Sequence, residues 1–234
     1  MYVTWFLTLI FQNMQLHTET TLQNQFLRTL GDKVAPENAA LVVVDVQNEF
    51  CADDGVFGKA GNDLSMVQEM LPNLQRLIEG ARAAGVPVIF VQAIYDPQYL
   101  PPAWHERNAR IGFETPRCLS GTWGADFYKV APMPGEAVVR KHRYSAFVDT
   151  ELDLILRSQQ IRTVIVAGVA TNICVESTAR DAFMKDYYVV FMDDASATYK
   201  KEAHEAAVAN VALAFGTAAT VGEVLDAWSL HSKK

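Results

Sequence analysis

The sequence has few cysteines and lacks the motifs of several common chemistries. Its three cysteines, Cys51, Cys118 and Cys174, show no CxxC spacing, so neither a disulfide framework nor a zinc knuckle is indicated. The five histidines are dispersed without ligand spacing, and no GxGxxG or GxxxxGK loop occurs. We therefore predict a site that holds neither a metal nor a nucleotide cofactor.

An excess of positive charge is also lacking. The net charge of −7 argues against nucleic acid or an anionic membrane as the main partner and favours a small-molecule substrate. The apolar segment 1–11 has no preceding positive charge and is too short to span a bilayer. With no disulfide framework expected, a reducing cytoplasm is the predicted location.

No linker, low-complexity stretch or repeat divides the 234 residues. We predict one domain over residues 36–234, preceded by an extension or arm over 1–35. An upstream-extended start codon or an arm packing on a sister subunit explains this segment better than a membrane tether. An apolar arm and an aromatic-rich loop offer surface for a homo-oligomer.

From residue 36 onward, apolar runs alternate with segments of helical periodicity. Because the strands are apolar throughout, they indicate a parallel sheet covered on both faces. The predicted fold is α/β, a three-layer αβα sandwich around a mainly parallel, doubly wound sheet. The expected strands are 39–45, 86–92, 137–140, 163–167, 187–192 and one near 219, and the expected helices are 64–84, 150–158, one starting at 171 and 201–215.

Three reactive side chains stand at the ends of predicted strands. Asp45 closes the first strand, Lys141 follows the third, and Cys174 lies three residues after Thr171, a candidate helix cap. Ligands of open parallel sheets bind beyond the carboxyl ends of the strands, where these residues can converge. The start of a helix favours a thiolate. A carboxylate, an ammonium and a thiol together suffice for nucleophilic attack on an amide.

Each of the three residues also has an ordinary explanation when it is taken alone. Asp45 could cap a turn, Lys141 could be a solvated lysine in a basic cluster, and Cys174 could be a small buried hydrophobe. Their joint placement at one edge favours the chemical interpretation.

Three segments, taken in their order along the chain, resemble the cysteine hydrolases of the isochorismatase-like superfamily. They are ALVVVDVQNEF at 40–50, VVRKHRYSAF at 138–147 and VAGVATNICVESTARDAF at 166–183. The resemblance implies a catalytic triad of Asp45, Lys141 and Cys174, and a cis peptide between Val169 and Ala170. It further implies that the N–H groups of Ala170 and Cys174 form an oxyanion hole, and that the protein is a dimer or tetramer.

Within the superfamily, the chain looks most similar to ureidoacrylate amidohydrolases and to the biuret, triuret and N-carbamoylsarcosine hydrolases. That likeness implies an amidohydrolase that cleaves a C–N bond of a small ureide or carbamoyl compound through a cysteine-linked intermediate. Zinc-binding nicotinamidases of the superfamily carry an aspartate and paired histidines after the catalytic aspartate, a pattern that this chain lacks.

Polar residues near the triad are candidate substrate contacts. Gln92 ends the second predicted strand and Asn48 follows Asp45 by one turn. Tyr144 lies three residues beyond Lys141, where the resemblance also implies a substrate contact. Each could instead cap a loop, end a strand or line a wall. The loop 95–126 is long and rich in aromatics, which favours a lid or a subunit contact over disorder. Its arginines could bind a substrate carboxylate or face solvent.

Two alternatives to an amidohydrolase stay open at this stage. A vinyl-ether hydrolase of the isochorismatase type is one, although such relatives often lack the cysteine. A non-catalytic binding protein with the same fold is the other, and the intact set of Asp45, Lys141 and Cys174 counts against it.

Overall fold

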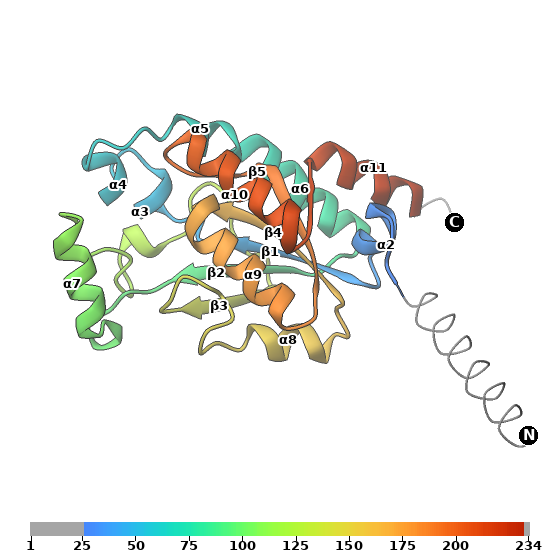
Figure 1. Ribbon diagram of the computed structural model, residues 1–234, viewed down its shortest axis with the longest axis horizontal. Coiled ribbons are helices and arrows are strands. Elements are labelled where there is room, and N and C mark those ends of the chain that lie inside the picture. Colours follow the sequence, from blue (N-terminus) through green and yellow to red (C-terminus); the bar gives the residue numbers. More distant parts are fainter. Residues whose placement is uncertain (1–25, 232–234) are drawn as a thin grey trace, which may run out of the picture.

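The computed structural model describes residues 26–231 and contains one six-stranded parallel sheet (Figure 1). The strand order is β3-β2-β1-β4-β5-β6, so the chain winds outward in one direction from β1 and in the other from β4. All neighbouring strands pair in parallel. The strands are β1 (Ala39–Val44), β2 (Val88–Ala93), β3 (Ala137–Lys141), β4 (Thr163–Val169), β5 (Tyr188–Ala197) and β6 (Thr217–Ala219).

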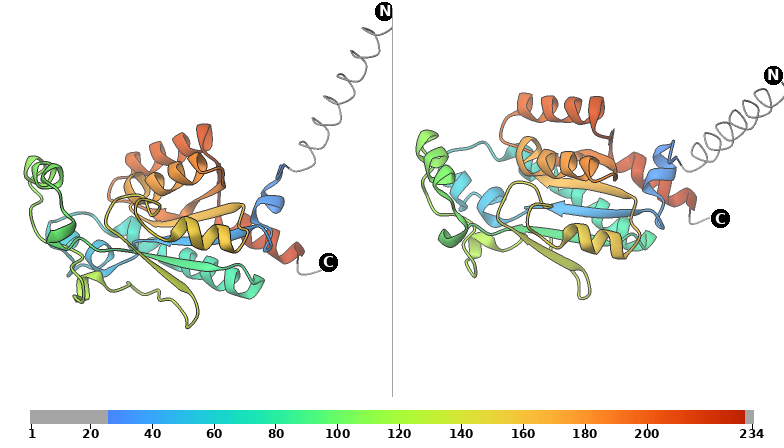
Figure 2. Two further views of the ribbon diagram at one scale, coloured as in Figure 1. Left: turned by 90° about the horizontal axis from the view of Figure 1, so that it is seen from below. Right: turned by 60° about the horizontal axis from the view of Figure 1, so that its bottom comes forward.

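Helices cover both faces of the sheet (Figure 2). Along β1, Leu41 and Val43 pack with α6 (Leu71–Ala84) and α11 (Val221–His231) on one face. Val42 and Val44 pack on the other face with α8 (Leu152–Ser158), α9 (Glu176–Met184) and α10 (Lys201–Ala214). Because successive strand side chains point to opposite faces, the unbroken apolar run of β1 contributes side chains to two hydrophobic cores, one on each face of the sheet. The predicted αβα sandwich is confirmed.

Several boundaries differ from those expected. The predicted helix 64–84 is divided into α5 (Ser65–Glu69) and α6, and Pro72 lies in the first turn of α6. Proline lacks the N–H that a continuous helix would use and favours a helix start. The helix α11 was not predicted.

The packed body begins before residue 36. The short helix α2 (Leu30–Val34) places Val34 in the core, and the Trp228 indole donates to the Val34 carbonyl at 2.7 Å. Residues 30–35 therefore belong to the sandwich and not to a separate arm. Of the rest of the predicted arm, residues 1–25 lie outside the described residues.

The segment 95–126 carries short helices beyond the carboxyl ends of the strands. It contains η1 (Pro97–Tyr99), α7 (Pro102–Arg110) and η2 (Trp123–Ala125). Two further short helices, α3 (Asn48–Cys51) and α4 (Val56–Lys59), follow β1. Figure 1 shows α7 standing off the sheet, apart from both helical layers. Among residues 26–231, no helix combines the length and apolar character needed to span a bilayer.

Candidate active site

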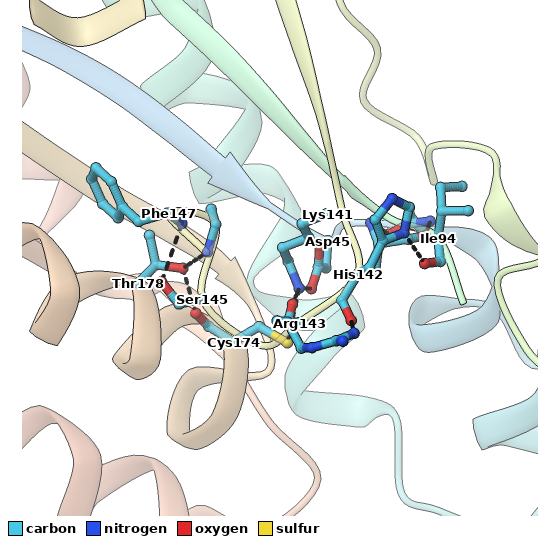
Figure 3. A network of polar contacts seen from close by, with 12 residues as sticks. Asp45, Ile94, Lys141, His142, Arg143, Ser145, Phe147, Cys174 and Thr178 are labelled. Carbon is cyan, nitrogen blue, oxygen red and sulfur yellow. Dashed lines mark hydrogen bonds and ion pairs between the residues drawn. The ribbon is translucent and has the colours of Figure 1, made fainter. Parts of the chain in front are cut away.

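The site lies at the point where the strand order reverses, between β1 and β4. Asp45 directly follows β1, Lys141 ends β3, and Cys174 lies in η3 (Thr171–Val175), a π-helical turn that follows β4 and runs into α9. Such a reversal leaves a crevice at the carboxyl edge of an open sheet. Figure 3 shows that the three side chains, far apart in the sequence, meet there.

The Lys141 ammonium group holds the triad together. Its Nζ atom lies 2.7 Å from Asp45 Oδ2 and 3.4 Å from Cys174 Sγ, and it donates to the Arg143 carbonyl at 2.9 Å. Three partners account for all three N–H bonds of an ammonium. The side chains of Lys141 and Asp45 are fully buried, so solvent does not screen their attraction. Lys141 is therefore a fixed cation beside the sulfur.

Burial controls the protonation of the triad. It raises the pKa of the Cys174 thiol to about 12; Lys141 opposes this shift and Asp45 adds to it. Burial also raises the pKa of Asp45, against the pull of Lys141. Burial lowers the pKa of Lys141, but the charges of Asp45, Cys174 and Tyr95 and the hydrogen bond to Asp45 together outweigh it, so the pKa is well above its usual value. Burial thus favours the thiol form of the resting sulfur, whereas the helix start was expected to favour the thiolate.

The backbone around the sulfur is also specialised. The peptide bond between Val169 and Ala170 is cis, as the sequence resemblance implies. Among the hydrogen bonds of residues 26–231, none uses the Ala170 N–H as donor. Asp45 has a φ of 51°, in the left-handed region that aspartate tolerates better than most residues.

A cavity of about 330 Å³ opens onto the reactive groups. Asp45, Ala170 and Cys174 contribute to its wall, and so does Tyr144. Its volume suits a small ligand. The remaining lining includes five aromatic residues, Phe50, Phe57, Tyr95, Phe113 and Tyr199, and its other charged members are Arg107, Arg117 and Lys200.

The other two predicted substrate contacts, Asn48 and Gln92, bind the backbone of η2 and not the cavity. The Asn48 amide donates to the Trp123 carbonyl at 2.7 Å, and the Gln92 amide donates to the Ala125 carbonyl at 2.7 Å. Neither residue lines the cavity. Both hold the backbone of η2 beside the sheet edge, so we leave them out of the proposed substrate site and keep Tyr144.

A polar relay of Thr171, His204 and Asp193 supports η3, and the sequence analysis did not predict it. The Thr171 hydroxyl lies 2.9 Å from His204 Nδ1, and His204 Nε2 lies 2.9 Å from Asp193 Oδ1. Thr171 was expected to cap the helix. It does not, because its side chain contacts His204 of α10 instead. Histidine and aspartate 11 residues apart, on α10 and β5, gave no local signal in the sequence.

The described residues hold no group of three or more histidine, cysteine, aspartate or glutamate side chains arranged to bind a metal ion. A site without metal stays a prediction, and a chelator tests it.

Comparison with known proteins identifies the family of this chain. The profile of the isochorismatase domain matches residues 39–223, which include all three triad positions. The chain belongs to the isochorismatase family. Family members are hydrolytic enzymes, and the chain is 39% identical over 209 residues to the ureidoacrylate amidohydrolase RutB of Enterobacter sp. (strain 638), covering 83% of this chain and 91% of that relative.

Solved structures of other hydrolases share the fold. A cysteine hydrolase from Pseudomonas syringae pv. phaseolicola 1448A has a TM-score of 0.74 at 25% identity, covering 88% of this chain and 96% of that one. The N-carbamoylsarcosine amidase of Thermoplasma acidophilum has a TM-score of 0.63 at 29% identity, covering 78% and 95%. The matches support amidohydrolase activity for this family member.

Proposed function

We propose that this enzyme hydrolyses a C–N amide bond of a small ureide or carbamoyl compound through an intermediate on Cys174. The observation that carries the proposal is the contact of one fixed ammonium with both Asp45 and the Cys174 sulfur beside a small cavity. A nucleophile, a base and a cation within direct contact are the elements of acyl transfer.

The first half of the reaction consumes the amide. Asp45 takes the thiol proton while Sγ attacks the carbonyl carbon, and Lys141 stabilises the negative sulfur electrostatically. The N–H groups of Ala170 and Cys174 stabilise the carbonyl oxygen as it becomes negative. The tetrahedral intermediate then collapses, the C–N bond breaks, and the Asp45 carboxylic acid gives its proton to the leaving nitrogen.

The second half restores the thiol. Asp45, again a carboxylate, takes a proton from water, whose oxygen attacks the carbonyl carbon bound to sulfur. The C–S bond breaks, and the proton on Asp45 returns to Cys174. Lys141 takes no part in these proton transfers, because its raised pKa and its three partners keep it protonated.

The names of the relatives guide the choice of substrate. The amidohydrolases matched by sequence are named for ureidoacrylate, and one structural neighbour is named for N-carbamoylsarcosine. Both names describe a carbamoylated nitrogen compound, and the cavity volume fits molecules of that size.

Ammonia release from a panel of substrates tests the proposal. The panel contains ureidoacrylate, biuret, triuret, N-carbamoyl amino acids and nicotinamide, with isochorismate assayed separately for the vinyl-ether alternative. We expect turnover of at least one ureide or carbamoyl compound, with no change after dialysis against EDTA. A folded preparation that cleaves isochorismate instead, or nothing at all, would overturn the proposed function.

A further inference from the structure

Two arginines lie in the cavity wall. Arg107, on α7, is half-buried, and Arg117 is 7% exposed. Among the ion pairs of residues 26–231, none includes either guanidinium group. The acidic residue of the lining, Asp45, is already paired with Lys141. The cavity therefore carries unbalanced positive charge inside a protein of net charge −7.

Neutral groups hold the two arginines in place. Arg107 donates to Asn108 Oδ1 at 3.0 Å, and Arg117 donates to the same oxygen at 3.3 Å. Arg117 also lies over the Phe113 ring at 4.8 Å, and Arg107 over the Tyr144 ring at 5.7 Å. These contacts fix the guanidinium planes and leave their charge uncompensated.

Tyr144 connects the arginines to the reactive end of the cavity. Burial raises the pKa of its hydroxyl group, the two arginines act against that shift, and Cys174 adds to it. Tyr144 is thus within electrostatic reach of both the sulfur and the guanidinium groups. One small ligand in this cavity can face all of them.

We propose that Arg107 and Arg117 bind a carboxylate group of the substrate, so that the enzyme prefers anionic ureides or carbamoyl compounds to neutral ones. The inference rests on the proposed function for the carbamoyl end of the ligand. The planar guanidinium forks match a carboxylate, and charge-assisted hydrogen bonds to it compensate two charges that are costly to keep in a buried wall. Lys200, a third cation of the lining, is exposed and is not assigned to this role.

Binding to an inactive enzyme tests the inference without requiring turnover. The Cys174→Ser protein is titrated by calorimetry with 3-ureidopropionate and with its carboxamide, which differ in the carboxylate alone. We expect the carboxylate to bind about 10- to 100-fold more tightly. Equal affinity, or no binding of either compound, would overturn the inference.

Variants then assign the preference to the two arginines. Arg107→Met keeps an apolar stem over Tyr144, and Arg117→Lys keeps the charge but loses the fork. In either variant, made in the Cys174→Ser background, we expect the ratio of the two dissociation constants to fall by about tenfold. Binding of the carboxamide reports that the cavity is still formed.

Arg110→Gln is the matched control, because Arg110 lies on the same helix but is exposed and pairs with Glu106. Its ratio should equal that of the parent protein. A ratio that stays unchanged in both cavity variants, or that falls equally in the Arg110 variant, contradicts the assignment. The proposed function fails separately, when the wild-type enzyme cleaves no member of the substrate panel.

Discussion

At the scale of single residues, Lys141 decides which group moves the proton in the proposed mechanism. Its three N–H bonds are directed to Asp45, Cys174 and the Arg143 carbonyl, so it has no free position from which to act as a base. Asp45 is the remaining group beside the thiol, and its raised pKa suits a carboxylate that must accept a proton and later return it.

The raised pKa of Cys174 predicts a pH profile for alkylation. In the absence of substrate, inactivation by iodoacetamide should accelerate about tenfold per pH unit between pH 7 and pH 9 without levelling off, because the thiolate is the reactive form and burial raises the thiol pKa. Peptide mapping separates Cys174 from the other two cysteines. A rate that levels off below pH 9 would mean that the resting enzyme holds a thiolate, against this account.

At the scale of elements, the end of β4 is constrained by its neighbour β1. Gly168 has a φ of 124°, and a Cβ atom there would lie 2.1 Å from the Val44 carbonyl oxygen. The strand can therefore approach β1 at the switch point only with glycine at this position. The cis peptide and Asp45 both follow within two residues of that approach.

Gly168→Ala is expected to lower the free energy of unfolding by more than about 2 kcal/mol and to abolish activity, because it adds a clash and an unfavourable φ. Chemical denaturation and the ammonia assay measure both effects. Gly222→Ala in α11 is the control, since its Cβ would meet only Thr220 Oγ1 at 3.9 Å. Equal stability of the two variants would disprove the constraint.

The relay behind η3 gives a second prediction at this scale. His204→Phe removes the partner of the Thr171 hydroxyl, and we expect kcat to fall about tenfold while KM changes little, since the turn that carries Ala170 and Cys174 loses support. His204→Gln should recover part of the loss. Glu205→Gln, at an exposed neighbouring position of α10, serves as control. A positioning role would be contradicted if KM changed in proportion to kcat in all three variants.

At the scale of the whole molecule, the sequence predicted the sandwich because fully apolar strands and periodic helices are local signals. The triad was predictable for a related reason: Asp45, Lys141 and Cys174 each stand at the end of a strand, and parallel strands share one carboxyl edge. The placement of Arg107 and Arg117 was not predictable, since it depends on how the segment 95–126 folds over that edge. Asn48 and Gln92 stand at the same edge, but their side chains hold η2.

Burial of three cysteines predicts a loss of stability at alkaline pH. Burial raises the pKa of Cys51, Cys118 and Cys174 from an ordinary value of 9.0. The unfolded chain releases these protons above pH 9 and the folded chain keeps them, so stability is intact below pH 9 and falls above it. Each thiol should contribute about 1.4 kcal/mol per pH unit.

Denaturation at pH 8 to 11 checks this slope. Cys118→Ala should make the slope shallower by about one thiol's share, whatever its effect on stability at pH 8. A slope identical to that of the parent protein would exclude the buried thiols as its cause.

The predicted homo-oligomer and the predicted cytoplasmic location stay predictions, and sedimentation velocity would test the first.

The central claim is that the sulfur of Cys174 attacks the substrate carbonyl. Its most direct test is the rate of ammonia release by Cys174→Ser on the best substrate of the panel, with the thermal unfolding midpoint measured on the same sample. We predict a loss of at least about 10³-fold at an unchanged midpoint, because serine fills the same space without an equivalent nucleophile. Turnover within tenfold of the wild-type rate would contradict the account.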